Sequence, residues 1–309
     1  MPLFTRRTVL LAKIESVSGT DSTPDAANNA VQVFDLDLSI KADMKERYSG
    51  TGDRSAASEI RGKSTAEIKF TVELKGSGTK GTAPRYAPLL KSCDRAETLA
   101  ANTACYYDMA TSSETCTIYA NIDGIYHKMV GCAGDCEIDL AAGEFPKLKF
   151  SMQGSYALPT DLTCPTPTLD STVAQVVKGT TTTLGLYQAI IEKVNLKFGN
   201  SVVERTDMNA AEAVKGFIVC DRYPVGSLSA EMILRATVSA DFWNYFDAGV
   251  TKAFSFALGS TAGNVVTITA PVCRLRAPKY GDRDGLRTVD LEFQMARNSG
   301  NDEMRIVLT

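Results

Sequence analysis

Three glycines have the spacing of a dinucleotide-binding turn. Gly76, Gly78 and Gly81 spell G-x-G-x-x-G directly after a strand-like segment, which is where such a turn would lie. A dinucleotide site also needs a following helix and a parallel sheet. Here Pro84 and Pro88 bracket only a stub of helix, and hairpin-like segments follow. We interpret the motif as a glycine-rich loop and predict no cofactor.

Cysteine and histidine could form a metal site or a disulfide. The first half contains five closely spaced cysteines and the only histidine of the chain: Cys93, Cys105, Cys116, Cys132, Cys136 and His127. Cys132-x-x-x-Cys136 is the single close pair, and a zinc site would need a second one. We therefore predict no metal. The sequence does not decide whether a disulfide forms between Cys132 and Cys136, or between Cys93 and Cys105, once the protein is released into oxidising surroundings. The favoured interpretation is that buried cysteines, such as Cys136 and Cys273, act as small apolar residues.

No residue pattern supports catalysis. His127 lies between Tyr126 and Lys128 on a strand-like segment, and no G-x-S-x-G or H-E-x-x-H motif surrounds it. The loop from Gly281 to Gly285 resembles a calcium loop, but an apolar Leu291 stands at the bidentate position. We predict that the protein is not an enzyme.

Length and composition indicate a globular protein with more than one domain. The chain has 309 residues, 44% hydrophobic residues and a formal net charge of -3. This length suits two domains of roughly 150 residues, and the charge offers no general attraction to nucleic acid. No apolar run approaches the roughly 20 residues of a membrane-spanning helix. The apolar run before Lys13 is too short for a signal peptide, so we expect the chain to stay in the cytoplasm where it is made.

Strict alternation of apolar and polar residues predicts strands with one buried face. The clearest examples are the segments Leu286–Arg297 and Pro146–Gly154. Val31–Lys41 and Thr65–Lys75 alternate in the same way. Between these two lies Asp43–Lys63, which is charged, rich in Gly and Ser and poor in large apolar residues. Such a segment predicts a projecting loop.

The second half repeats these features in the same order. Leu36 matches Val194, Phe70 matches Leu234, Tyr86 matches Phe242, and Phe150 matches Phe293. Ala230–Val238 is expected to be the counterpart of Ala66–Leu74, and Asn200–Asp221 the counterpart of the projecting loop. Residues 158–185 are rich in Pro and Thr, which is typical of a linker or an extended arm. We predict domains at 1–157 and 186–309 with the same fold.

Several blocks of the sequence resemble tail tube proteins of long-tailed bacteriophages. These blocks are RTVLLAKIESVSGTDSTP, VELKGSGTKGTAPRYAPLLKSC, and the stretch from KVNLKFGNSVVERTDMNAAEAVKG to GDRDGLRTVDLEFQMARNSGNDE. The resemblance implies a β-sandwich or partial barrel with a short flanking helix in each half. It also implies that such domains form sixfold rings, whose inner sheets close into a barrel, and that the rings stack into a tube.

A structural tube subunit in the virion tail, assembled in the host cytoplasm, is therefore expected. Two tube domains per chain imply homotrimeric, pseudo-hexameric rings, although the number of chains stays open between three and six. The implied partners are further copies of the chain, the tail terminator and tail tip proteins, and the tape measure protein inside the tube. Double-stranded DNA would pass through without tight binding. The alternatives are a tube protein of a contractile tail or secretion system, or a ligand-binding β-sandwich such as an adhesin.

Period-two alternation assigns residues to the two faces of the predicted wall. The channel-lining residues should be Asp35, Asp37, Glu67, Lys69, Glu73, Lys193, Asn195, Lys197, Glu231 and Arg235. The side chains packed beneath the helices should be Phe34, Leu36, Leu38, Ile68, Phe70, Val72, Leu196 and Leu234. The loops that reach the next ring should carry Glu46, Arg47, Arg54, Glu59, Glu204, Arg205 and Asp207.

Overall fold

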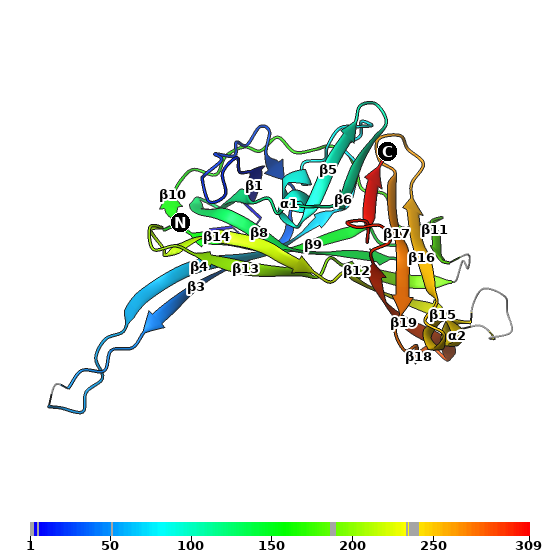
Figure 1. The fold of residues 1–309 in the computed structure, drawn as a ribbon. Helices are drawn as coiled ribbons and strands as arrows, with labels where there is room; N and C mark the ends of the chain where they lie inside the picture. Colours follow the sequence, from blue (N-terminus) through cyan, green and yellow to red (C-terminus); the bar gives the residue numbers. More distant parts are fainter. Residues whose placement is uncertain (1–2, 5, 51, 186–189, 233, 235–240) are drawn as a thin grey trace.

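The protein is built mainly of antiparallel strands (Figure 1). The computed structural model describes residues 3–4, 6–50, 52–185, 190–232, 234 and 241–309. Two short helices, α1 (Ala87–Ser92) and α2 (Phe242–Asp247), accompany the strands in this part of the chain. The mainly β fold class expected from the alternating segments is confirmed.

A sheet of four long strands forms the centre of the first half. β3 (Phe34–Lys45) pairs with β4 (Ile60–Glu73), which pairs with β9 (Lys147–Tyr156), which in turn pairs with β8 (Ile125–Ala141). All of these pairings are antiparallel. The order of this sheet is therefore β3, β4, β9, β8.

The second half contains a sheet with a comparable order. β12 (Ile191–Lys197) pairs with β15 (Val225–Glu231), and β15 pairs with β19 (Leu286–Ala296). β19 then pairs with β17 (Val266–Leu275) and with β18 (Lys279–Arg283). β3 thus lies at one end of the first sheet and β8 at the other, while β12 lies at one end of the second sheet and β17 with β18 at the other. That the two halves superpose as the same fold stays a prediction.

The two sheets join edge to edge at a contact that we call the internal seam, β8 with β12. Glu137–Ala141 of β8 pairs antiparallel with Lys193–Lys197 of β12. Main-chain bonds extend the seam at both ends, because Ala142 N–H donates to Glu192 O at 2.9 Å and Phe198 N–H donates to Cys136 O at 3.0 Å. The sheets of the two halves are therefore one continuous sheet, and it is not closed into a barrel.

The remaining strands pack against this sheet or extend it. In the first half they are β1 (Thr8–Ile14), β2 (Ala30–Val31), β5 (Arg95–Ala100), β6 (Ala104–Met109), β7 (Cys116–Ile122) and β10 (Thr160–Asp161). Later in the chain they are β11 (Thr181–Leu184), β13 (Asn200–Thr206), β14 (Val214–Arg222), β16 (Thr251–Leu258) and β20 (Arg305–Leu308). The C-terminal β20 pairs on one side with β17 and on the other with β6. It is a second connection between the halves.

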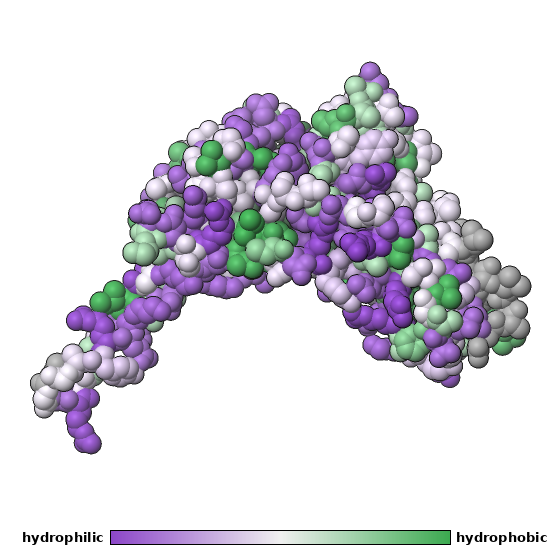
Figure 2. All heavy atoms as spheres, viewed as in Figure 1, coloured by the Kyte–Doolittle hydropathy of each residue, from purple (hydrophilic) through white to green (hydrophobic). Residues whose placement is uncertain are grey.

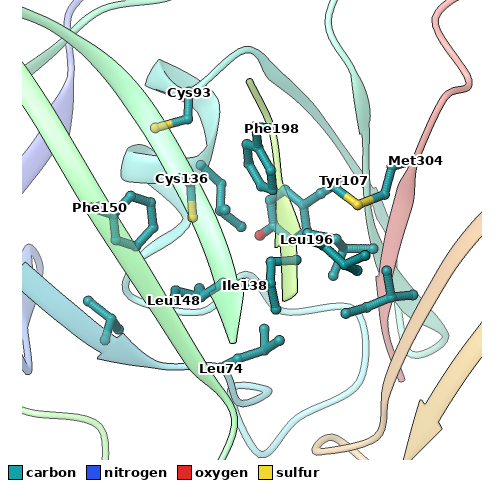
Figure 3. Packing of buried hydrophobic residues seen from close by; sticks show 14 of the residues in the cluster. Leu74, Cys93, Tyr107, Cys136, Ile138, Leu148, Phe150, Leu196, Phe198 and Met304 are labelled. Atoms are coloured by element: carbon teal, nitrogen blue, oxygen red, sulfur yellow. The ribbon is translucent and has the colours of Figure 1, made fainter. Parts of the chain in front are cut away.

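One apolar core runs beneath the sheet through both halves (Figure 3). Directly opposed residues of neighbouring strands point to the same face, and they form an apolar row across the seam. The row is Val72, Leu148, Ile138, Leu196, Gly226, Phe293 and Leu275. Its large side chains are at most 4% exposed. Burial on one face explains why these strands alternate in the sequence.

The expected partner strand in the second half begins earlier than the sequence indicated. The strand equivalent in order to β4 is β15, Val225–Glu231; of the expected segment Ala230–Val238, residues 233 and 235–238 lie outside the described residues. Leu234 is 81% exposed, so the prediction that it packs inward is wrong. The apolar signal of β15 is weak because it has Gly226 where a Cβ would lie 2.3 Å from the Phe293 ring. The aromatic ring of the neighbouring strand fills that space instead.

The segment Asn200–Asp221 is not a projecting loop. It contains a hairpin of β13 and β14, which folds back onto the first half. Val214 and Phe217 are buried with Ala133 of β8 in a small separate core. Glycines allow this close approach, since a Cβ on Gly131 would lie 2.6 Å from Gly216 Cα. By contrast, the corresponding first-half arm, residues 43–63, extends away from the rest of the molecule (Figure 1).

Residues 158–185 lie along the chain's own surface. β10 pairs with β8, and β11 pairs with β16. Thr168 N–H donates to Ala26 O and Val177 N–H to Glu144 O, at 2.9 and 2.7 Å. In this structure the segment therefore connects the halves while it contacts both, and the boundaries of independent domains stay a prediction.

The glycine-rich loop packs tightly against a turn of the second half. Gly78 N–H donates to Gly263 O at 3.0 Å, and Gly76 N–H donates to Asn264 Oδ1 at 2.9 Å. A Cβ on Gly76 would lie 2.0 Å from Gly263 O. Because glycine has no side chain, the backbone of the glycine-rich loop can contact the backbone of the turn at Gly263 directly.

Candidate functional site

The residues predicted to line the channel lie on one face of the continuous sheet. Asp37 is opposite Lys69 on β3 and β4, and Glu73 is opposite Lys147 on β9. The same face continues through the internal seam. One row across it reads Thr71, Lys149, Glu137, Lys197, Val225, Gln294 and Arg274. We call this surface the polar face.

Every predicted channel-lining residue that the structure describes belongs to a strand of this sheet. They are Asp35, Asp37, Glu67, Lys69, Glu73, Lys193, Asn195, Lys197 and Glu231. Arg235 lies outside the described residues. Of the apolar set, Ile68, Phe70, Val72 and Leu196 are buried on the opposite face. Whether the polar face lines a channel stays a prediction.

Charges on the polar face are largely compensated within the chain. Glu67 accepts hydrogen bonds from the ammonium groups of Lys41 and Lys69, the latter at 2.9 Å. These bonds hold the pKa of Glu67 below its ordinary value. At the internal seam, Asp139 contacts Lys149 at 2.7 Å and Lys193 at 3.4 Å. Burial alone would raise the pKa of Asp139, but the two lysines bring it below its ordinary value.

The internal seam itself has a clear distribution of charge. β8 contributes the acidic Glu137 and Asp139, while β12 contributes Lys193 and Lys197. Lys197 Nζ lies 3.4 Å from Glu137 Oε2, and the Asn195 amide donates to the other oxygen of Glu137. The polar face is therefore acidic on one side of this seam and basic on the other.

Replacing Glu67 by Gln should destabilise the protein near neutral pH but not in acid. Because the folded-state pKa of Glu67 is lowered, its stabilisation is fully present above its ordinary pKa of 4.5 and is lost as the pH falls through the lowered value. We expect a loss of up to about 1 kcal/mol at pH 7, since the pairs are solvent-screened. Urea unfolding at pH 7 and pH 3 measures it.

The matched control for this experiment is Glu59→Gln, at an exposed loop position. This change should alter neither the stability at pH 7 nor its dependence on pH. An equal loss of stability at both pH values for Glu67→Gln would contradict the electrostatic explanation.

Several residues of the polar face were not among those predicted from the sequence. They are Lys147 and Lys149 on β9, Glu137 and Asp139 on β8, and Asp290 and Glu292 on β19. Each alternates with buried residues, so the period-two rule that identified the others would also have found them. Arg274 also alternates with the buried Cys273 and Leu275, whereas Lys279 has no comparable signal because it follows Pro278, which interrupts the alternation.

The residues predicted to reach a neighbouring ring fall into two different environments. Glu46, Arg47, Arg54 and Glu59 belong to the tip of the arm, and all are exposed. Glu204 and Arg205 belong to β13, where Glu204 contacts Lys63 Nζ at 2.8 Å and Arg205 donates to Ser18 Oγ at 3.4 Å. Asp207 lies in the β13–β14 turn, and accepts hydrogen bonds from Asn209. The four residues of the arm are thus exposed, whereas the three residues of the β13–β14 hairpin form contacts within the chain.

The cysteines and the histidine lie within or beneath strands. Cys93, Cys105, Cys116, Cys132, Cys136 and Cys273 are buried, and all eight cysteines are free thiols. Burial raises the pKa values of Cys93, Cys132 and Cys136. His127 faces Ala120 across β7 and β8, and burial lowers its pKa. In the part of the chain that the structure describes, no group of three or more His, Cys, Asp or Glu side chains could hold a metal ion.

The described helices also include none that is long and apolar enough to cross a membrane.

The comparison with known protein families agrees with this architecture. The family described as phage tail tube protein matches residues 5–295. No curated protein matches the sequence at a significant level. The family match contains both halves of the continuous sheet and the internal seam between them. Because it covers nearly the whole chain, the protein belongs to the phage tail tube protein family.

Proposed function

We propose that three copies of this chain form a pseudo-hexameric ring, and that stacked rings make a tube whose channel conducts DNA during genome ejection. In this arrangement, each half contributes one section of the wall. The polar face lines the channel, and the apolar face with its covering strands and helices forms the outer wall.

The observation that carries this proposal is the continuous polar face across the internal seam. The seam shows how a second-half sheet can extend a first-half sheet by antiparallel pairing. A sheet with long unpaired edges must be covered, paired or closed, and a ring of identical chains closes it. The chain's own internal contact thus supports the kind of contact that a ring requires.

The charge pattern of the polar face suits the passage of DNA. Tight binding to phosphate requires uncompensated Lys or Arg, since each neutralised phosphate adds affinity. Here Lys41 and Lys149 are paired with carboxylates of adjacent strands, and Lys69 is paired with Glu67 of its own strand. Such a surface would be hydrated and would offer few free cations to a passing duplex.

The proposed partners follow from the position of such a tube in a virion tail. Copies of the chain would be the main partner. A tape measure protein would fill the channel before ejection, and terminator and tip proteins would contact the ends of the tube. Assembly would take place in the host cytoplasm.

Negative-stain microscopy of the purified chain at high concentration tests the proposal. We expect rings or tubes with three chains per ring and pseudo-sixfold density. Six chains per ring would contradict the trimer, and polar-face residues such as Lys69 on the outer wall would contradict the assignment of the channel. A protein that remains monomeric at every concentration, even with tail terminator protein added, would contradict the function.

Deleting Ser49–Ser58 should leave a folded protein that no longer polymerises. The described residues of this range, all but Thr51, belong to the exposed tip of the arm, and none of them belongs to the buried core. We expect an unchanged thermal unfolding midpoint and no tubes, because the arm is proposed to reach the next ring. A variant in which a Gly-Ser sequence of equal length replaces this segment separates the effect of sequence from that of length. Normal tubes from the deletion variant would argue against the inter-ring role.

A further inference from the structure

The continuous sheet has two free edges, and they lie at opposite ends of the molecule (Figure 1). At one end, β3 pairs with β4, and no other described strand lies along its second edge. At the other end, β17 pairs with β16 as far as Arg274. Beyond this residue, the outer edge of residues 275–283, including β18, has no described strand beside it, although its inner edge pairs with β19.

The internal seam occupies the corresponding edge of the first half. β8 pairs with β7 from Ile125 to Cys132, and then with β12 from Glu137 to Ala141. β17 pairs with β16 in the same way, but the place that β12 would take next to residues 275–283 is empty among the described strands. The second half therefore presents an edge like the one that β8 presents to β12.

Burial shows that β3 lacks the neighbour that β12 has. On β12 and directly after it, Val194, Leu196 and Phe198 are 3%, 0% and 1% exposed. On β3, Leu36 and Leu38 are only half-buried, and Ile40 is 46% exposed. The two strands have similar alternation, so the difference arises from the unpaired edge of β3. A strand along that edge would cover these side chains.

The charges of the two free edges are complementary, and their signs are reversed relative to the internal seam. β12 carries Lys193 and Lys197, which meet the acidic β8. β3 instead carries Asp35 and Asp37, while the free edge of the second half carries Arg276 and Lys279. Arg276 and Lys279 both project to the polar face, where they contact Glu292 at 3.6 and 3.1 Å. Their side chains are 50% and 69% exposed.

The hairpin that follows β12 indicates where the arm would lie. After the internal seam, β14 crosses β8 and reaches the end of α1, where Arg222 contacts Asp94 at 2.6 Å. The base of the arm that continues from β3 contacts its own chain through ion pairs such as Lys63 with Glu204, but its apolar Met44 and Ile60 remain 48% and 51% exposed. Figure 2 shows green apolar surface among purple residues near the base of the arm. At the end of α2, Phe246 and Val250 are likewise 45% and 38% exposed.

We propose that β3 of one copy pairs antiparallel with residues 275–283 of a second copy, and that the base of its arm lies over the end of α2 in that copy. The internal seam provides the geometry, and the reversed charges provide the recognition. This inference rests on the proposed ring, and it specifies which edges meet and in which order.

The sign reversal also explains how wrong contacts would be avoided. β3 placed against β8 would bring Asp37 toward Glu137 and Asp139. β12 placed against the far edge would bring Lys193 and Lys197 toward Arg276. Like charges across an interface are unfavourable, so each edge accepts only the other. The contact is therefore head-to-tail, as a cyclic ring requires.

Two charge-reversed variants test the proposal. The first changes β3 by Asp35→Asn and Asp37→Lys; Asn is chosen because Asp35 has a φ of 52°, which Asn tolerates. The second changes the far edge by Arg276→Glu and Lys279→Glu. A third chain combines all four substitutions. The control is Lys80→Glu with Lys178→Glu, which reverses exposed charges outside both edges. Thermal unfolding of each monomer shows whether the fold is retained.

We expect each single-edge variant to need at least about tenfold more protein than the wild type to polymerise. The control should polymerise like the wild type. The chain with all four substitutions should recover most of the wild-type behaviour, because both edges have exchanged their charge. Wild-type tubes together with unimpaired single-edge variants would overturn the seam but leave the proposed function intact. Failure of the wild type to form rings or tubes would instead contradict the function itself.

A mixture of the two single-edge variants gives an independent readout. Each variant can bind only the other, so hetero-oligomers should appear in native mass spectrometry. Since unlike chains must alternate, a ring with an odd number of chains cannot close, and closed rings of three should be absent. Detection of homo-oligomers alone would overturn the pairing.

Discussion

Phe70→Asp should prevent the protein from folding. Phe70 is 2% exposed, and its ring stacks on Phe150 with centroids 5.5 Å apart. Truncation of such a side chain typically costs about 3–5 kcal/mol, and an unpaired carboxylate in the same place adds a further penalty. Together these approach or exceed the 5–15 kcal/mol that typically stabilises a whole domain. Circular dichroism and the soluble fraction after expression measure the effect.

The adjacent residue provides the matched control. Lys69 points to the polar face, where its side chain is 57% exposed and pairs with Glu67. Lys69→Glu should therefore cost less than about 1 kcal/mol, and should change the charge of the polar face without unfolding the protein. Comparable loss of fold for both variants would contradict the assignment of the two faces, because a register shift of one residue exchanges them.

Removal of residues 298–309 should cause the second large loss of stability. This truncation deletes β20, which pairs with both β17 and β6. It also removes Met304, Ile306 and Leu308, which are at most 3% exposed. Arg95 would lose the carbonyl of Met304, to which its Nη1 donates at 3.1 Å. Since each buried aliphatic side chain contributes roughly 2–5 kcal/mol, we expect the truncated chain to be largely unfolded or insoluble.

A graded series at Ile306 separates side-chain packing from strand pairing. Ile306→Val should lower the free energy of unfolding by about 0.5–1.5 kcal/mol, and Ile306→Ala by about 2–5 kcal/mol. Guanidinium unfolding of the full-length variants measures both. A truncated protein that unfolds at the same denaturant concentration as the full chain would show that β20 does not hold the halves together.

Strands with one buried face could be predicted from the sequence, because burial on one side creates alternation. β3, β4, β9 and β19 all lie where alternation placed them. The same alternation separated the polar residues from the core, since each side chain of a strand points opposite to its neighbours. An exception is Phe34, which a bulge in β3 places opposite Thr71 of the polar face and not with the apolar set. The signal is local, and it needs no knowledge of the partner strand.

Other elements depend on contacts that a local pattern does not contain. In β15, small residues replace large apolar ones because Phe293 of the neighbouring strand fills the space beside Gly226. The hairpin of β13 and β14 has the apolar run from Phe217 to Val219, but the polar residues around it suggested a loop. Its partner surface includes Ala133 of β8, which lies far away in the sequence.

The pairing of the two halves could not be predicted from the sequence either. Alternation assigns Lys193, Lys197, Glu137 and Asp139 to polar positions, but it does not say that β12 lies beside β8. Only the register of the seam shows that these opposite charges meet. The excess of basic residues at one sheet edge and acidic residues at the other likewise acquires meaning only after the order of the strands is known.

The internal seam has a consequence for the entropy of assembly. Every association between separate molecules loses translational and rotational freedom, at an estimated cost of about 4–15 kcal/mol. Contacts within one chain avoid this loss, and a connecting segment such as residues 158–185 adds only a slowly growing closure term. In the proposed ring, every second contact would form while its chain folds and would not depend on protein concentration. Joining two modules in one polypeptide would thus halve the number of molecular encounters needed to close each ring.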